Sequence, residues 1–421
     1  MESAMNRPEV RSPIPQRGHL GFRGNLAATR YGWLRLTPAY SVHLVGALLD
    51  AHATAASRVL DPFCGTGTTA LACAERGLAC DTTDINPFLL WLAAAKTRPY
   101  TDADLAAFRR AATAVERAAD GDTPAWTPPL HQIEKWWTPE TLAALARIRA
   151  GIEIQSGAIP AAAVDLLKLA FCRALIETAH VSFGHQSMSF KKAPQQSTAA
   201  DPVTDSFRRA AALLAESART PILARPNPIR CDARALSPAL PRAHYDCVIT
   251  SPPYPNRMSY IRELRPYMYW LGHLESAKQA GDLDYTAIGG TWGTATSRVA
   301  KWQPPSEIAI PFAPFESLLG RIAGSAAKHG RLLARYVHKY FHDMTIHAAA
   351  LADVVAPGGT IHHVVGNSKF YDVLLPVEEI FAALFAANGF ERIEVRAIRK
   401  RTSKKELFEF VVSGTRKKES R

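Results

Sequence analysis

The stretch from residue 58 to residue 86 constrains the fold of this chain more than any other. Arg58-Val59-Leu60 has the composition of a buried strand, and the glycine-containing turn Asp61–Thr69 follows it. A helix pattern then starts at Ala70, and Ala79–Thr83 has the composition of a second strand. A strand, a glycine-rich turn, a helix and a second strand form the opening unit of a parallel sheet. The sequence therefore predicts an α/β fold.

The same stretch predicts a ligand that carries a ribose. Gly65 and Gly67 permit positive φ and a close approach of a ligand to the backbone. The turn has neither the G-x-G-x-x-G spacing of dinucleotide sites nor the lysine of a P-loop. Asp84, at the end of the second predicted strand, is placed to accept hydrogen bonds from two ribose hydroxyls. A ribose site without a pyrophosphate loop indicates a nucleoside ligand.

A second motif, Ser251-Pro252-Pro253-Tyr254, follows the buried-strand pattern Tyr245–Thr250. Proline fixes φ and brings no N–H, so the carbonyls of this loop are left without local ladder bonds. Ser251 adds a small hydroxyl and Tyr254 a flat ring. Such a loop could hold a planar, amino-bearing ring by stacking and by accepting its N–H hydrogens. The alternative is an ordinary proline-rich turn with a packing tyrosine.

Together the two motifs resemble those of the amino-methyltransferases, which use S-adenosylmethionine to methylate exocyclic nitrogens of DNA bases. The resemblance covers residues 31–99 and 225–272, with a weaker continuation to about residue 415. It implies a Rossmann-like, seven-stranded class I methyltransferase sheet with a mostly helical insertion. The serine form of the tetrapeptide is most typical of the cytosine-N4 branch.

The resemblance also implies the site residues. The tetrapeptide is similar to the family's catalytic S/N/D-P-P-Y motif, and Asp232 is similar to the family residue that takes the adenine amino group of the cofactor. The implied catalytic residues are Ser251, Pro252, Pro253 and Tyr254. The implied cofactor-binding residues are Asp61, Phe63, Gly65, Gly67, Thr68, Asp84, Asn86 and Asp232.

In the expected reaction, Ser251 Oγ and the Pro252 carbonyl accept the two N–H bonds of the target amine. Tyr254 stacks on the base, and the nitrogen attacks the sulfonium methyl in line. The base must leave the duplex to reach such a loop. A carbon-5 methyltransferase would need a nucleophilic cysteine, typically after proline, and no Pro-Cys pair occurs in the sequence.

The charge of the chain favours a polyanionic partner. Fifty Lys and Arg residues against 38 Asp and Glu residues give a formal net charge of +12. Double-stranded DNA is the expected partner, and a cognate restriction endonuclease, in a restriction-modification or defence system, is a further candidate. The candidate nucleic-acid contacts are Lys191 and Lys192, which follow an aromatic, Ser- and His-containing run, and Arg257, Arg262 and Arg265, which follow the tetrapeptide.

The chain divides by pattern into five parts. We expect a flexible segment at 1–30, the first part of the catalytic domain at 31–99 and a helical insertion at 100–224, which is the candidate target-recognition region. The second catalytic part is expected at 225–415, with an irregular excursion at 275–317, and a charged tail at 416–421. Helices are predicted at 42–51, 102–119, 139–150, 161–178, 207–218, 318–355 (one or two) and 377–387, and further strands at 228–231, 360–365, 392–398 and 407–412.

Composition also indicates the compartment. The sequence has neither an apolar run long enough for a membrane span nor the apolar core of a signal peptide, so no membrane partner is expected. Six cysteines without a C-x-x-C pair fit the reducing interior of a bacterial or archaeal cell, where the protein would associate with the nucleoid. His338 and His342 have metal-ligand spacing but no convincing third ligand, so no metal is expected.

The target atom has alternatives. The cofactor motif precedes the tetrapeptide in this chain, whereas many serine-type family members have the reverse order, so adenine N6 is the alternative to cytosine N4. A base amino group of RNA is the third candidate. A different class, a non-catalytic nucleic-acid binder on a degenerate fold, is opposed by the intact glycines, Asp84 and the complete tetrapeptide.

Overall fold

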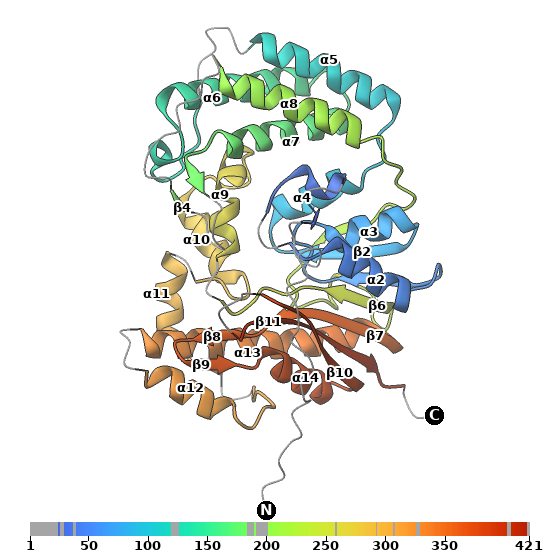
Figure 1. The fold of residues 1–421 in the computed structure, drawn as a ribbon, viewed down its shortest axis with the longest axis vertical. Coiled ribbons are helices and arrows are strands. Elements are labelled where there is room, and N and C mark those ends of the chain that lie inside the picture. Colours follow the sequence, from blue (N-terminus) through green and yellow to red (C-terminus); the bar gives the residue numbers. More distant parts are fainter. Residues whose placement is uncertain are drawn as a thin grey trace, which may run out of the picture.

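The computed structural model describes residues 24–25, 29–36, 39–118, 126–182, 189–190, 201–256, 259–291, 293–305, 308–325, 329–401 and 406–418. In Figure 1 a helical layer lies above a sheet that has helices on both faces, and α9 runs between the two parts.

The central sheet has seven strands in the order β10-β11-β7-β6-β1-β2-β5. The strands are β1 (Arg58–Asp61), β2 (Ala79–Asp84), β5 (Asn227–Arg230), β6 (Tyr245–Thr250), β7 (Val355–Gly366), β10 (Phe390–Lys400) and β11 (Phe408–Arg416). The five strands from β7 to β5 are parallel, and β11 pairs antiparallel with both β7 and β10. This is the expected Rossmann-like class I methyltransferase sheet, which the structure confirms.

Alternate residues of the central strands face two different layers of helices. Val59, Cys247 and Ile249 pack with α2 (Val42–His52) and α3 (Thr68–Arg76). Leu60 and Val248 pack with the helices of the other face. Those helices are α12 (Phe315–Ala323), α13 (Gly330–Val354) and α14 (Val377–Ala387). Because both faces are covered, the strands are apolar runs, as the sequence predicted.

The helices expected between residues 100 and 224 are present. They are α5 (Asp102–Ala118), α6 (Pro139–Ser156), α7 (Ala161–Glu177) and α8 (Pro202–Ser217). Thr138 and Asp201 cap α6 and α8 by accepting hydrogen bonds from backbone N–H groups in the first turn. Trp136 and Trp137, just before α6, are buried.

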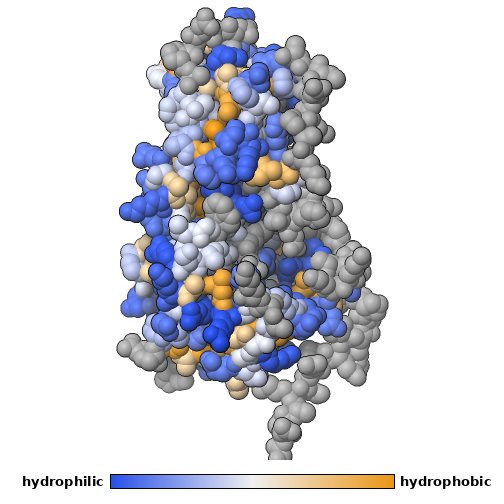
Figure 2. All heavy atoms as spheres, turned by 90° about the vertical axis from the view of Figure 1, so that its left-hand side faces the viewer, coloured by the Kyte–Doolittle hydropathy of each residue, from blue (hydrophilic) through white to orange (hydrophobic). Residues whose placement is uncertain are grey.

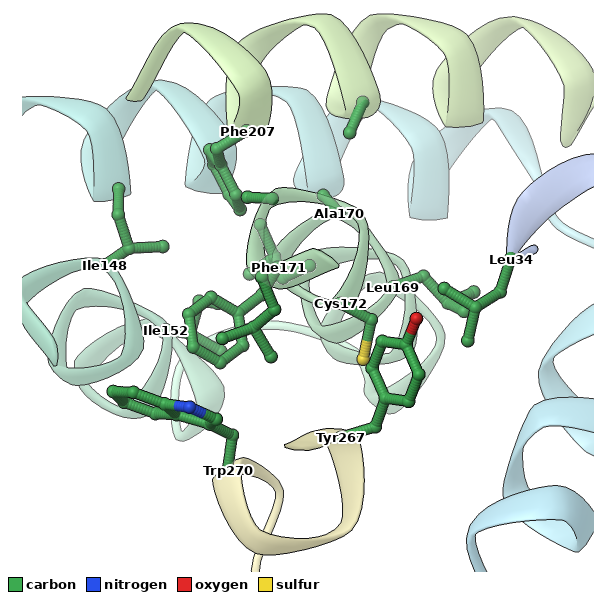
Figure 3. Packing of buried hydrophobic residues seen from close by; sticks show 14 of the residues in the cluster. Leu34, Ile148, Ile152, Leu169, Ala170, Phe171, Cys172, Phe207, Tyr267 and Trp270 are labelled. Carbon is green, nitrogen blue, oxygen red and sulfur yellow. The ribbon is translucent and has the colours of Figure 1, made fainter. Parts of the chain in front are cut away.

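The core of this helical layer extends beyond the predicted insertion. It includes α4 (Pro87–Thr97) and the C-terminal half of α9 (Tyr260–Trp270). Figure 3 shows Tyr267 and Trp270 of α9 pointing into the core, with the Trp270 ring packed edge-on against Phe171 of α7 at a centroid distance of 5.6 Å. One helix therefore belongs both to the segment that follows the tetrapeptide and to the helical layer.

Of the segment expected to be flexible at 1–30, the structure describes residues 24–25 and 29–30. Asn25 is buried, accepts a hydrogen bond from Val42 N (2.9 Å) at the start of α2 and donates to the Tyr40 carbonyl (2.8 Å). Arg30 is buried as well, because its guanidinium donates to backbone carbonyls of the sheet part and of the helical layer. The local sequence pattern does not predict the contacts of Arg30, because its two partners lie 66 and 188 positions away in the sequence.

The segment expected to be irregular at 275–317 contains two complete helices, α10 (Ala277–Thr286) and α11 (Thr294–Lys301), and the start of α12. Ser276 caps α10 by accepting a hydrogen bond from Gln279 N. Glycines with positive φ, Gly289 and Gly293, lie between α10 and α11. The Gly-rich composition therefore marks the turns between short helices.

Two short strand pairs lie outside the central sheet. One consists of β3 (Val181–Ser182) and β4 (Ser189–Phe190), and the other of β8 (Ser368–Phe370) and β9 (Val373–Leu375). Among the described residues, no helix is both long and apolar enough to cross a membrane. On the face that Figure 2 shows, hydrophobic residues form small groups separated by hydrophilic ones.

Candidate active site

Both predicted motifs lie at the same edge of the sheet. Parallel strands present their carboxyl ends together, and the strand order reverses between β1 and β6, where α/β sheets bind their ligands. Thr250, the last residue of β6, donates a hydrogen bond to Asp61 Oδ1 at the end of β1 (2.6 Å). Residues almost two hundred positions apart in the sequence are thereby joined at one point.

The two glycines of the loop have different roles. Gly65 has a φ of 49°, and a Cβ built on it would meet only the Phe63 carbonyl, at 3.7 Å. The space over Gly65 is therefore open to a ligand. Gly67 has a φ of 73°, but its Cβ would lie 2.9 Å from Ala93 Cβ on α4. Gly67 therefore allows the loop to pack on α4, and its part in cofactor binding stays a prediction.

Asp84 is half-buried beside the open glycine. Its Oδ2 accepts a hydrogen bond from Gly65 N (3.1 Å) and its Oδ1 accepts one from Asn86 N (2.9 Å). Each carboxylate oxygen can accept a second hydrogen bond. Burial raises the pKa of Asp84 to about 6. The side chain can therefore accept hydrogen bonds from two hydroxyl groups at neutral pH.

Asp61 is buried at the base of the same loop. Its Oδ1 accepts hydrogen bonds from Thr250 Oγ1 and from Phe63 N (3.1 Å), whereas its Oδ2 has no partner among the described residues. Burial raises the pKa of Asp61 to about 7. A buried carboxylate oxygen without a partner favours a positive charge nearby.

Two further predicted cofactor residues use their side chains within the protein. Thr68 is buried, and its hydroxyl is 3.0 Å from that of Thr66. Asn86 is buried as the N-cap of α4; its Oδ1 accepts a hydrogen bond from Phe88 N (3.0 Å), and its Nδ2 lies 3.5 Å from Met268 Sδ. These contacts hold the loop and α4 in place, and the part of both residues in cofactor binding stays a prediction.

Lys96 supports the loop from behind, and the sequence reasoning missed it. Its Nζ is buried and donates to the carbonyls of Thr66 (3.0 Å) and Tyr31 (3.3 Å). Burial lowers its pKa to about 8. The available signal was a lone lysine near the end of an otherwise apolar helix.

Phe63 connects the loop to β7 and α13. The Phe63 side chain is half-buried, and its ring packs edge-on against His347 of α13 at a centroid distance of 4.9 Å. His347 is buried with Nδ1 2.8 Å from the Ala233 carbonyl and Nε2 3.4 Å from His363 Nε2 of β7. Burial lowers the pKa of His347 to about 4, so the ring is neutral at physiological pH.

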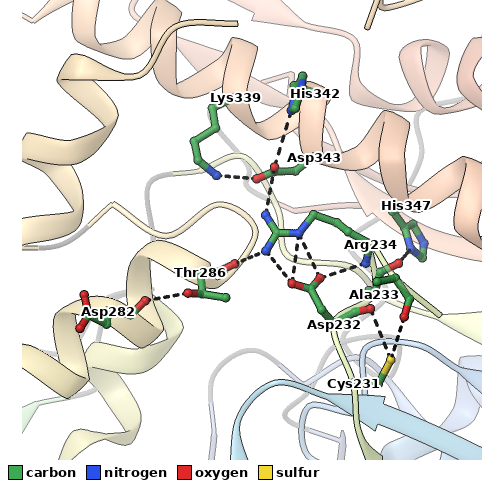
Figure 4. A network of polar contacts seen from close by, with 11 residues as sticks. Cys231, Asp232, Ala233, Arg234, Asp282, Thr286, Lys339, His342, Asp343 and His347 are labelled. Carbon is green, nitrogen blue, oxygen red and sulfur yellow. Dashed lines mark hydrogen bonds and ion pairs between the residues drawn. The ribbon is translucent and has the colours of Figure 1, made fainter. Parts of the chain in front are cut away.

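Asp232 lies just beyond β5, and Arg234 holds its carboxylate (Figure 4). Oδ1 accepts from Arg234 N (2.9 Å) and Nε (3.0 Å), and Oδ2 accepts from Nη2 (2.7 Å). The Arg234 guanidinium also donates to Asp343 Oδ1 (3.0 Å) and to the Thr286 carbonyl (2.8 Å). Asp343 in turn accepts from Lys339 (2.6 Å). Oδ2 of Asp232 also accepts from Arg234 Nε (3.3 Å), so Arg234 occupies both acceptor positions of each Asp232 oxygen, and this bond is the longest of the four.

The tetrapeptide begins with a serine whose hydrogen is already committed. Ser251 Oγ donates to the Val364 carbonyl of β7 (3.1 Å). The Ser251 hydroxyl also contacts the Tyr254 side chain. A hydroxyl has one hydrogen and two acceptor lone pairs, so with its hydrogen on the Val364 carbonyl Ser251 Oγ acts as an acceptor toward a ligand. The Pro253 carbonyl accepts a hydrogen bond from Tyr340 of α13 (2.7 Å).

Tyr254 is held at its backbone, its hydroxyl and one ring face. Its N–H donates to Tyr260 Oη (3.1 Å), and its Oη donates to Glu409 Oε1 of β11 (3.2 Å). The Arg401 guanidinium lies over its ring, 5.3 Å from the centroid. Burial raises the pKa of Tyr254 well above its usual value, so the hydroxyl remains protonated.

The predicted nucleic-acid contacts are only partly described. Arg262 and Arg265 lie on α9 and are half-buried, and burial lowers the pKa of Arg265 to about 10. Lys191, Lys192 and Arg257 lie outside the described residues. His338 and His342, which have metal-ligand spacing, both pack edge-on against Trp302.

The sheet order and the site define a protein with a class I methyltransferase fold and an acid at the carboxyl end of each of three parallel strands. No protein-family model matches the chain. The chain is similar to the type II methyltransferase M.AvaI of Nostoc sp. (strain PCC 7120) and of Anabaena variabilis, with 21% identity over 424 aligned residues in each case. The similarity covers 88% of this chain and 81% of each relative.

Among solved structures, the chain is similar to the rRNA methyltransferase aviRa from Streptomyces viridochromogenes, with 12% identity over 93% of this chain and 92% of that chain. The TM-score is 0.28, which is too low to add to the argument. The distant homology to M.AvaI, together with the fold, supports a methyltransferase that uses S-adenosylmethionine.

Proposed function

We propose that this protein is a DNA methyltransferase that transfers a methyl group from S-adenosylmethionine to the exocyclic N4 of cytosine, in a restriction-modification or defence system. The resemblance of the serine tetrapeptide to the cytosine-N4 branch supports the target atom. The name of the relative M.AvaI, a type II methyltransferase, supports DNA as the substrate and a restriction endonuclease as a partner.

The described residues fit S-adenosylmethionine. Asp84 would accept the two ribose hydroxyls beside the open face of Gly65. Asp232 Oδ2 would accept one N–H of the adenine amino group in place of its longest bond, the one from Arg234 Nε (3.3 Å). The unpartnered Oδ2 of Asp61 favours the positively charged methionine end. When bound, the cofactor supplies an electrophilic methyl group on a sulfonium.

The observation that carries the proposal is the hydrogen bond from Ser251 Oγ to the Val364 carbonyl. It fixes Ser251 as an acceptor, and the amino group of a base needs acceptors. The Pro252 carbonyl would accept the second N–H of the amine. Both bonds draw the nitrogen lone pair out of conjugation with the ring, which makes the nitrogen a better nucleophile toward the methyl group. As the N–C bond forms, the bond from the methyl carbon to sulfur would break, S-adenosylhomocysteine would leave, and the nitrogen would release one proton to solvent.

Tyr254 would hold the extruded base by stacking. Its hydroxyl and one ring face are occupied by Glu409 and Arg401, so its position is set before the base arrives. Lys191, Lys192, Arg257, Arg262 and Arg265 would bind phosphates of the DNA strand around that base. Adenine N6 is the second candidate target, because the cofactor motif precedes the tetrapeptide in this chain.

Alanine substitutions in the tetrapeptide test the proposal. Ser251→Ala should lower the rate of methyl transfer to DNA about ten- to a hundredfold, since one N–H loses its acceptor in a desolvated site. Tyr254→Ala should lower the rate further, because it removes the stacking face. Binding of DNA and of S-adenosylhomocysteine should remain unchanged in both variants.

Ser413→Ala is the matched control, since it removes a hydroxyl that contacts His362 on the same sheet, away from the tetrapeptide. Equal rates for the parent and Ser251→Ala would contradict the assigned role of the serine. Methyl transfer to RNA alone would contradict the substrate class.

A further inference from the structure

The adjoining ends of β10 and β11 lie beside the tetrapeptide. β11 is antiparallel to β7, and its register places Glu409 opposite Gly366 and Lys400 opposite Phe408. The C-terminal end of β10 and the N-terminal end of β11 therefore lie at the edge of the sheet that carries Ser251. Arg399, Lys400 and Arg401 are half-buried at this edge.

Two of these cations have different electrostatic surroundings. Arg399 is neutralised by Glu409, which accepts hydrogen bonds from its Nε (2.5 Å) and Nη2 (3.0 Å). Among the described residues, no carboxylate lies within ion-pair distance of Arg401. The Arg401 guanidinium donates to the Asn367 carbonyl through Nη1 (2.8 Å), which occupies one of its five N–H donors. Arg401 therefore keeps a net positive charge and N–H groups that can bind another acceptor.

Arg401 also lies against the proposed base-stacking residue. Its guanidinium carbon is 5.3 Å from the centre of the Tyr254 ring. Both side chains occupy the space next to Gly366, where a Cβ would lie 2.2 Å from Arg401 Nη1 and 2.9 Å from Tyr254 Cε2. A glycine at the end of β7 is therefore what allows the guanidinium and the ring to come together.

We propose that Arg401 binds a backbone phosphate of the DNA strand that carries the target base and at the same time supports the far face of Tyr254. This inference rests on the proposed function and adds a phosphate-binding residue on the C-terminal hairpin. A planar guanidinium can stack on a ring with its face and donate to a phosphate with its edge. Phosphate binding and the positioning of the stacking ring are coupled through one side chain.

The salt dependence of DNA binding tests the phosphate contact. The probe is a random-sequence duplex, bound by the full-length protein with S-adenosylhomocysteine present. Arg401→Ala should reduce the slope of log affinity against log salt by about 0.9, the value for one phosphate contact. Arg396→Ala is the matched control, because it removes the same charge from an exposed position on β10, about 15 Å from the edge, and should keep the slope.

A second variant separates the two roles. Arg401→Lys keeps the charge and loses the planar face, so it should keep the salt slope of the parent but slow single-turnover methyl transfer to unmethylated genomic DNA about tenfold. Arg401→Ala should lose both. An unchanged slope in Arg401→Ala would overturn the phosphate contact, and an unchanged rate in Arg401→Lys would overturn the support of Tyr254.

The outcome also distinguishes this inference from the proposed function. A parent protein that methylates DNA while Arg401→Ala keeps its slope would overturn the inference alone. A parent protein that binds DNA through Arg401 and transfers no methyl group to it would overturn the proposed function and leave the phosphate contact standing.

Discussion

Asp84 has two properties that tie the proposed cofactor site to pH. Its carboxylate is fixed by two backbone N–H groups, and burial raises its pKa to about 6. A carboxylate accepts hydrogen bonds from ribose hydroxyls more strongly when ionised. Because the pKa is raised, the side chain takes up a proton when the pH falls from about 7 to about 5.

We expect the affinity for S-adenosylmethionine to be about tenfold weaker at pH 5 than at pH 7, since about a tenth of Asp84 is ionised at the lower pH. Titration calorimetry across this range measures the change. Asp84→Asn should bind weakly and with a shallower pH profile, because only Asp61, with a pKa of about 7, then titrates in this range. A parent profile no steeper than that of Asp84→Asn would show that another group binds the ribose.

At the scale of single residues, the sequence predicts which residue types form the site better than it predicts which residues they contact. Acids at the ends of strands, and the glycine turn, follow from local pattern. Gly65 faces open space and Gly67 faces Ala93 because of the position at which α4 packs. No local sequence pattern predicts that position. The same holds for Asp232, whose carboxylate orientation is set by Arg234 and, through it, by Asp343, more than one hundred positions away.

Among the secondary-structure elements, α13 connects the two halves of the site. Tyr340 donates to the Pro253 carbonyl, His347 contacts Phe63 and the Ala233 carbonyl, and Asp343 holds Arg234. The sequence predicts this helix from its periodicity. It does not predict the contacts, because the partners of the buried polar side chains lie on loops whose positions depend on the tertiary structure.

Tyr340→Phe tests this connection. The change removes one hydrogen bond from the tetrapeptide, so methyl transfer should slow by up to about tenfold while the affinity for the cofactor stays unchanged. Rate and cofactor affinity are measured separately, by single-turnover kinetics and by calorimetry. Tyr371→Phe, on an exposed tyrosine, is the control. An equal loss of both quantities would indicate a general structural role for Tyr340 instead.

Across the whole molecule, Arg30 joins α4, which follows strand β2 of the sheet, to the end of α8 in the helical layer. Its guanidinium donates to the carbonyls of Lys96 (3.0 Å), in the last turn of α4, and Arg98 (2.6 Å), just after α4, and to those of Ala218 (2.5 Å) and Thr220 (2.9 Å) after α8. Burial lowers its pKa to about 10. The order of helices and strands was predictable from pattern, but this junction was not, because it is built from backbone carbonyls that carry no sequence signal.

Arg30→Met should lower the free energy of unfolding by about 3 kcal/mol, because buried carbonyls lose their donors while the volume is roughly kept. Urea unfolding measures the loss. Arg242→Met removes an exposed pair with Asp353 and should change stability by less than about 0.5 kcal/mol. A loss in Arg30→Met as small as that of the control would mean that the two parts are held together by their apolar contacts alone.

Nucleoside analysis by mass spectrometry tests the central claim most directly. The protein is expressed in a host that lacks DNA methylation, and the host DNA is then digested to nucleosides, with the Ser251→Ala protein as the reference. The account predicts N4-methylcytosine in the DNA of cells that express the parent protein and about ten- to a hundredfold less with the variant, when sites are far from saturation. N6-methyladenine would contradict the assigned base, and the absence of any methylated amino group from the DNA would contradict the assigned reaction.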